Sequence, residues 1–242
     1  MTVRIAYIEE PPFYWTGDDG RPTGADIELA EVVLRGIGVT SIAYHRTSFA
    51  EFLPGVREER WDMNVPIFVT AERAQQVSFS APVWTIGDGF LVRADNPKVL
   101  TSYEAVAARG DVRLGLIPAQ VQVDAAKAAG VSDDQIMLFN DQPEAVAALM
   151  AGRIDAFAAT ALGNRATAAT NPALDAVDVD AGKPGAELIG AFSFSTSNPD
   201  LREAVNAGLR GYLGTPDHRA RMAKYGFTRT EIDGVVGRAP DA

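Results

Sequence analysis

Short apolar runs alternate with amphipathic segments along almost the whole chain, and this alternation restricts the possible fold more than any single motif does. In the first part, apolar runs predict buried strands, and segments with apolar residues on one face predict helices. Asp26 is the expected N-cap of the first helix. The expected strands are 3–8, 41–44 and 65–69, and the expected helices are 26–36 and 49–56. Strands and helices in this order are typical of an α/β sheet with helices on its faces.

The same alternation begins again after the turn signal Asp95-Asn96-Pro97. Helices are expected at 103–108, 121–129, 143–151 and 161–170, and strands at 112–117, 136–139, 154–159 and 176–179. The extended run 188–195 then returns to the first block, which two tail helices at 200–213 and 216–225 complete. The sequence therefore predicts two α/β lobes, formed by 1–92 with 189–242 and by 93–188. A two-strand hinge would join them, with a ligand cleft between the lobes.

Composition excludes several classes of function. A net charge of −10 argues against nucleic acid or an anionic membrane surface as a partner. The absence of cysteine excludes thiolate metal sites and a cysteine nucleophile. His45 and His218 are the only histidines, and both are expected at the surface. No signal peptide precedes the first strand, which fits either a cytoplasmic protein or a mature form with an added start methionine.

The segment Thr70-Ala71-Glu72-Arg73 follows a buried strand and predicts the first turn of a helix. An arginine there can offer its planar fork to a carboxylate, and the N–H groups of the turn face the same place. We expect Arg73 to hold the carboxylate of a small ligand. The alternative is a surface arginine that pairs with Glu72 or another acid.

Several motifs, in order, resemble those of the family 3 extracellular solute-binding proteins. They are Pro12-Phe13, the stretch from Thr23 to Ala30, Arg60-Trp61-Asp62, the stretch from Thr70 to Ser80, Ala151-Gly152-Arg153-Ile154-Asp155-Ala156 and Lys224-Tyr225-Gly226-Phe227. The resemblance implies the type II two-lobed fold of periplasmic binding proteins and hinge closure over a small zwitterion. It implies an extracytoplasmic, monomeric partner of a membrane ABC permease. It also implies no catalytic residues, no cofactor and no metal.

In that family, the arginine of this motif binds the ligand carboxylate, and the hydroxyl three residues earlier, here Thr70, assists it. Position implies that Gln120, at the start of a helix in the second lobe, adds N–H groups. The alternative for Gln120 is a solvated loop residue. Two usual ammonium acceptors are absent, because Thr160 stands where an acid is common and Phe68 stands where a polar residue is common.

A desolvated cation still needs compensation. Glu10 and the aromatic residues Phe13, Phe49 and Phe68 are the candidates, since aromatic faces stabilise diffuse cations. With Arg73, this set resembles that of the ectoine and hydroxyectoine binders within the family. The alternative is that Phe13 and Phe49 are core or rim residues and that Glu10 is a solvated loop acid.

Three other functions stay open at this stage. The ligand of a binding protein could be an ordinary polar or cationic amino acid. Some members of this fold dehydrate prephenate or arogenate, and Glu10 would be the general acid of such an enzyme. The third possibility is the sensor domain of a receptor.

Overall fold

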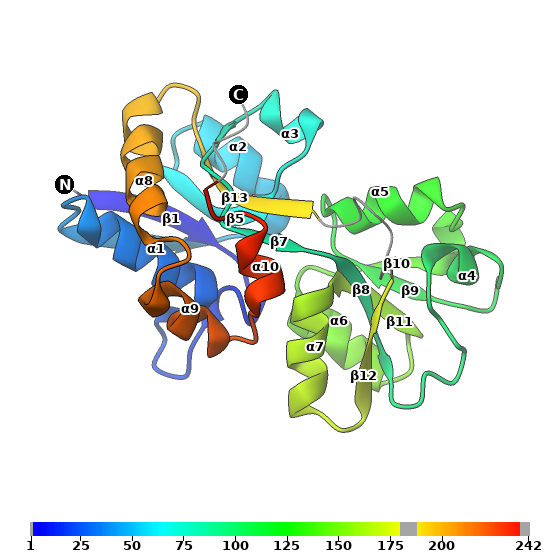
Figure 1. Cartoon of the computed structure of the whole chain (residues 1–242). Coiled ribbons are helices and arrows are strands. Elements are labelled where there is room, and N and C mark those ends of the chain that lie inside the picture. Colours follow the sequence, from blue (N-terminus) through cyan, green and yellow to red (C-terminus); the bar gives the residue numbers. More distant parts are fainter. Residues whose placement is uncertain (1, 180–187, 238–242) are drawn as a thin grey trace. The chain divides into compact units, whose positions relative to one another are not determined.

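The computed structural model describes residues 2–179 and 188–237 (Figure 1). Contacts divide them into two compact units, one formed by 2–8, 12–85 and 188–237 and the other by 9–11 and 86–179. The sequence predicts that the chain passes from the first lobe to the second after residue 92. Contacts instead end this part of the first unit at Thr85. The difference arises because strand β8 (Asp88–Arg93) pairs along its whole length with strands of the second unit.

The first unit is built on a mixed sheet in the order β4-β1-β5-β13-β6, with β7 also paired to β13. Strands β1 (Thr2–Tyr7), β4 (Ser41–Arg46) and β5 (Met63–Phe68) run parallel. Strand β13 (Leu188–Phe194) lies antiparallel to both β5 and β6 (Ser78–Phe79). Every residue of β5 is buried, as expected for the central apolar strand of a covered sheet.

The helices of the first unit come from both ends of the chain. Helix α1 packs against α8 and α9, so the tail returns to the first block as the sequence predicts. The elements are β2 (Trp15–Thr16), β3 (Pro22–Thr23), α1 (Ala25–Gly36), η1 (Phe49–Glu51), α2 (Phe52–Arg57), α3 (Ala71–Ala74), β7 (Trp84–Ile86), α8 (Pro199–Tyr212), α9 (Pro216–Ala223) and α10 (Arg229–Asp233).

The first helix does not begin as predicted. Its N-cap is Gly24, whose φ of 126° is unfavourable for other residues, and a Cβ there would lie 2.3 Å from the Phe13 carbonyl oxygen. Asp26 is therefore inside the helix rather than its cap. The Asp26 side chain is fully buried and accepts a hydrogen bond from Trp84 Nε1 at 3.1 Å. A long-range contact thus decides the role of Asp26.

The second unit carries a five-stranded sheet in the order β10-β9-β11-β8-β12. Strands β9 (Leu114–Leu116), β10 (Ile136–Leu138) and β11 (Ala156–Thr160) are parallel, whereas β8 and β12 (Leu174–Asp178) are each antiparallel to a neighbour. One core cluster joins strand residues such as Phe90 and Ala158 to the helices. The helices are α4 (Tyr103–Ala107), α5 (Val121–Ala128), η2 (Asp133–Gln135), α6 (Gln142–Met150) and α7 (Ala161–Thr170).

No helix within 2–179 and 188–237 combines the length and apolar character needed to cross a membrane. In the same residues, no group of three or more His, Asp and Glu side chains is arranged to hold a metal ion.

His218 corrects a prediction, because it is buried on α9 rather than exposed, with 1% of its surface accessible. Its Nδ1 accepts a hydrogen bond from Gly214 N at 3.1 Å, and its ring packs edge-on against Tyr212. Burial, and secondarily the charge of Arg219, lower the pKa of His218 to about 4, while Asp217 opposes the shift. The folded protein therefore keeps this imidazole neutral.

We expect this burial to make folding pH-dependent below pH 6.5. The unfolded chain binds a proton near pH 6.5 and the folded protein only near pH 4, so stability falls as the pH drops through this window. At pH 5 the loss relative to pH 7 is on the order of 2 kcal/mol. Urea unfolding at both pH values should show this loss in the wild type and not in His218→Gln. An equal loss in both proteins would contradict this role for His218.

Candidate functional site

Arg73 lies in a short helical turn that directly follows the central strand of the first unit. Strand β5 ends at Phe68, and Thr70 is the N-cap of α3. The Thr70 hydroxyl oxygen accepts a hydrogen bond from Arg73 N at 3.2 Å. The predicted helix start is therefore present, and Thr70 fixes the backbone from which the arginine extends.

The Arg73 side chain is buried, with 7% of the residue exposed, so it is not the surface arginine of the alternative interpretation. Its Nη1 donates a hydrogen bond to the Phe68 carbonyl oxygen at 2.8 Å. Its guanidinium carbon lies 5.1 Å from the ring centroid of the half-buried Phe49. A carbonyl and an aromatic face together orient the guanidinium fork, whose five N–H donors suit a carboxylate.

Trp84 joins two of the predicted aromatic residues. Its ring centroid lies 5.4 Å from that of Phe68 in an edge-on arrangement and 5.7 Å from that of Phe13. Phe13 also packs edge-on against Phe227 and is 2% exposed. The Phe13 ring is thus a core residue of the first unit in this structure, as the alternative interpretation holds, and Phe68 is packed beside it through Trp84.

In the second unit, Gln120 and Glu10 are in direct contact. Gln120 is the N-cap of α5, but its side chain does not cap the helix. Instead, Gln120 Nε2 donates to Glu10 Oε2 at 3.2 Å. Glu10 is 7% exposed and Gln120 is 6% exposed, so neither is a solvated loop residue. The structure places a buried carboxylate at the start of α5.

Thr160 stands at the carboxyl end of β11 and is the N-cap of α7. Its hydroxyl oxygen accepts a hydrogen bond from Gly163 N at 3.2 Å, and the residue is 6% exposed. The side chain therefore caps a helix as well as standing at a strand end.

The predicted residues form separate groups within each unit. Contacts join Arg73 to Thr70, Phe68 and Phe49, and join Glu10 to Gln120. The rings of Phe13 and Phe68 each pack against the ring of Trp84.

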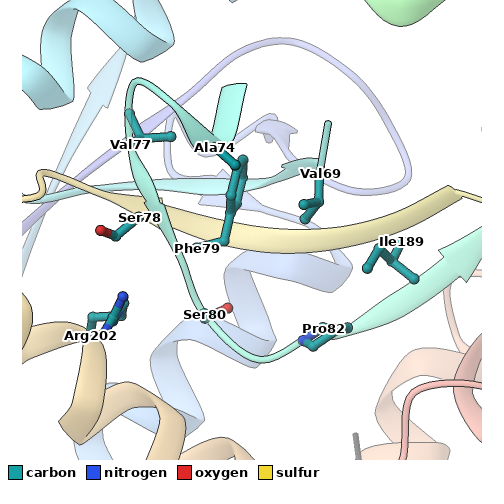
Figure 2. Close-up of a pocket in the computed structure, with 9 residues that line it drawn as sticks. All are labelled: Val69, Ala74, Val77, Ser78, Phe79, Ser80, Pro82, Ile189 and Arg202. Carbon is teal, nitrogen blue, oxygen red and sulfur yellow. The ribbon is translucent and has the colours of Figure 1, made fainter. Parts of the chain in front are cut away.

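A cavity of about 300 Å³ in the first unit lies beside the segment that carries Arg73 (Figure 2). Its lining is mainly apolar, with Arg202 of α8 at one side. None of the eight predicted residues lines it. This cavity is therefore distinct from the candidate site.

The sequence does not predict the contacts of Asp88, the first residue of β8. Its carboxylate accepts hydrogen bonds from Tyr103 Oη at 2.6 Å, Gln122 Nε2 at 3.0 Å and Gly89 N at 3.0 Å. The local sequence Gly87-Asp88-Gly89 gives no sign of these partners, because two of them come from helices later in the chain. Only the strand register brings Asp88 beside Thr160.

Comparison with known proteins identifies the family. The model of the bacterial extracellular solute-binding proteins, family 3, matches residues 3–228. A probable amino-acid ABC transporter periplasmic-binding protein of Sinorhizobium fredii is 28% identical over 96% of this chain and 79% of its own length.

Solved structures show the same fold. The structure of EhuB in complex with hydroxyectoine aligns with a TM-score of 0.85 at 24% identity, over 97% of this chain and 93% of that chain. An ancestral arginine-binding protein bound to glutamine aligns with a TM-score of 0.81 at 22% identity, over 93% and 97%. The predicted fold class, the type II fold of periplasmic binding proteins, is thereby confirmed. The chain belongs to the bacterial extracellular solute-binding proteins, family 3.

Proposed function

We propose that this protein is the substrate-binding component of an ABC importer and that it captures a small carboxylate-bearing zwitterion resembling ectoine or hydroxyectoine. The observation that carries this proposal is the buried Arg73 guanidinium, oriented by the Phe68 carbonyl and the Phe49 ring. A buried arginine fork of this kind is suited to bind one carboxylate through two parallel hydrogen bonds.

The cationic end of the ligand would meet Glu10 and the aromatic residues. Glu10 is a buried carboxylate that receives one hydrogen bond from Gln120. The Phe49 ring lies against the Arg73 guanidinium, and Phe68 contacts that guanidinium through its backbone carbonyl. Aromatic faces suit a delocalised ring cation better than a strongly hydrated primary ammonium. The hydroxyectoine complex among the similar folds supports this choice. Thr70, Gln120 and Thr160 would complete the polar contacts, and Phe13 would support them from the core.

A polar or cationic amino acid is the second candidate ligand. The relative in Sinorhizobium fredii is named as an amino-acid transporter component, and a similar structure is an arginine-binding protein. Amino acids present the same carboxylate to Arg73 and differ at the cationic end. The two candidate ligands therefore predict different effects on binding when Phe68 or Glu10 is substituted.

The importer role carries further expectations with it. The relative's name supports an ABC permease in the membrane as the partner and an extracytoplasmic location. We propose capture of the ligand by hinge closure in a monomer, without a chemical step.

Titration calorimetry tests the proposal directly. The panel contains ectoine, hydroxyectoine, glycine betaine and the twenty amino acids. Tight binding of ectoine or hydroxyectoine is the expected result. Tight binding of a simple amino acid with no response to ectoines would replace the first candidate by the second. Turnover of prephenate or arogenate that is lost in Glu10→Gln would overturn the transport role.

Phe68→Ser should weaken binding of a cyclic cation by about 5- to 30-fold, because it removes one aromatic face. The same change should admit primary amines, since the serine hydroxyl can accept their hydrogen bonds. Calorimetry with hydroxyectoine and L-glutamine measures both effects. Phe79→Ser, at a residue that lines the separate cavity, is the matched control. Unchanged affinity and selectivity in Phe68→Ser would remove Phe68 from the site.

A further inference from the structure

The cavity beside β6 lies entirely within the first unit, and its lining has a polar end and an apolar end. Its volume of about 300 Å³ is near the lower limit of the usual range for small-molecule pockets. Figure 2 shows Ser78 and Arg202 toward one end of the lining and Val69, Phe79 and Ile189 toward the other. Such a cavity suits a small molecule with one polar end and an apolar body.

Arg202 is the charged residue of this lining, and one donor of its guanidinium has no acceptor. Its Nε is buried and makes no hydrogen bond within the part of the chain that the structure describes. Its Nη2 donates to Glu203 Oε1 at 2.9 Å, but the Glu203 side chain is 56% exposed. Adjacent residues of a helix do not face each other, and exposed ion pairs contribute little to stability. The pair with Glu203 therefore leaves the buried Nε–H group to be satisfied from the cavity.

A second buried donor lies one turn further along the same face of α8. Asn206 is fully buried, and its Oδ1 accepts a hydrogen bond from Ala81 N at 2.7 Å, which fixes the orientation of the amide. Its Nδ2 makes no hydrogen bond to any described residue. Ala81 stands between Ser80 and Pro82, which both line the cavity. The wall between α8 and the end of β6 thus has an excess of hydrogen-bond donors, which favours a ligand whose polar end only accepts.

The lining also determines which charges a ligand can carry. No aspartate or glutamate is among the described residues that line the cavity. A cation taken out of water needs an opposite charge nearby, so the ammonium group of an amino acid would stay uncompensated there. A carboxylate without a cationic group meets the Arg202 guanidinium instead.

We propose that this cavity is a second binding site, which takes a small carboxylic acid with an uncharged, apolar body, and that Arg202 Nε binds the carboxylate. The body of the acid packs on Val69, Phe79 and Ile189. The site differs in place and in ligand class from the one proposed for the zwitterion. The inference therefore does not rest on the proposed function.

The probes are 4-methylpentanoate and phenylacetate, since each carries one carboxylate on a compact apolar body. Each acid is compared with its amide, which lacks the charge, by titration calorimetry. The wild type should bind at least one acid about 10-fold or more tightly than the matching amide. Leucine and phenylglycine are the same acids with an added α-ammonium group. They should bind Arg73→Ala, in which binding through Arg73 is removed, about 10-fold or more weakly than the acid does.

Four variants locate the bound acid. Arg202→Gln should weaken its binding about 10-fold or more, because the charge that pairs with the carboxylate is lost. Arg73→Ala should change this binding by less than about threefold, since Arg73 does not line the cavity. Ser78→Leu should also cost about 10-fold or more, because the larger side chain fills the polar end. Arg210→Gln, at an exposed arginine of the same helix, is the matched control and should bind as the wild type does.

Circular dichroism checks that each variant is folded, and if Arg202→Gln or Ser78→Leu is not, the other decides. Failure of both acids to bind the wild type overturns the inference. A loss in Arg73→Ala as large as that in Arg202→Gln does so too, because the acid would then occupy the site proposed for the zwitterion. Equal losses in Arg202→Gln and Arg210→Gln, or equal binding of acid and amide, would remove the role of Arg202. None of these results contradicts the proposed function, which the zwitterions test.

Discussion

Arg73→Ala is expected to weaken ligand binding by at least 100-fold. The substitution removes the fork that pairs with the ligand carboxylate and leaves that carboxylate buried without a partner. Breaking a buried charge pair in this way costs about 3–5 kcal/mol, and each 1.4 kcal/mol is a tenfold change in affinity. Calorimetry with the tightest ligand of the panel measures the loss directly.

Two variants control for this result. Arg73→Lys keeps the charge but loses the bidentate geometry, so its affinity should lie between those of the wild type and Arg73→Ala. Arg202→Ala removes an arginine of the same unit that lines the separate cavity, and it should bind as the wild type does. Retained affinity in Arg73→Ala would remove this arginine from the site.

Trp84→Ala is expected to give the largest loss of stability among these changes. The ring contacts Phe13 and Phe68, and a Cβ on Gly190 would lie 2.2 Å from it, so the indole packs directly on the backbone of β13. Removing a buried tryptophan costs about 3–5 kcal/mol. Loss of the Nε1 donor to buried Asp26 adds about 1 kcal/mol or more. Urea unfolding followed by circular dichroism measures the difference.

Trp15→Ala is the matched control, because Trp15 is half-buried on β2 and its recorded ring contact is with Tyr225. Its loss should be clearly smaller. Trp84→Phe should recover most of the packing energy while lacking the hydrogen bond to Asp26. Equal losses in Trp84→Ala and Trp15→Ala would contradict the central position of Trp84.

Local patterns predict the order of the elements well. The predicted run 65–69 largely coincides with the buried strand β5 (Met63–Phe68), and the predicted turn begins at Thr70, whose side chain caps it. The errors concern residues whose surroundings come from distant parts of the chain. Asp26 is a residue type that commonly caps helices, but here it lies inside the helix and its carboxylate accepts a hydrogen bond from Trp84. His218 is a polar residue type, yet it is buried.

The same distinction applies to the candidate site. Arg73 and Thr70 belong to one short motif, so the sequence alone predicts their contact. Glu10 and Gln120 are each singled out by position, but their hydrogen bond joins residues from widely separated segments. The sequence around Asp88 gives no sign of its contacts, because they depend on strand register and on helices later in the chain. Pairing register is a tertiary property that a single sequence does not reveal.

The order of strands in the first sheet bears on how the protein is made. Strand β13 pairs with both β5 and β6, yet the whole second unit is synthesised before it. During synthesis, the edge of the apolar strand β5 that pairs with β13 therefore stays unpaired until β13 is made. Exposed unpaired edges of apolar strands promote aggregation. Most of the second unit comes from one continuous stretch, 86–179. The entropy cost of closing its loops is therefore lower than that of the first unit, whose segments are far apart in the sequence. The later-made unit is thus expected to finish folding first, and the earlier one needs protection until residues 188–194 emerge.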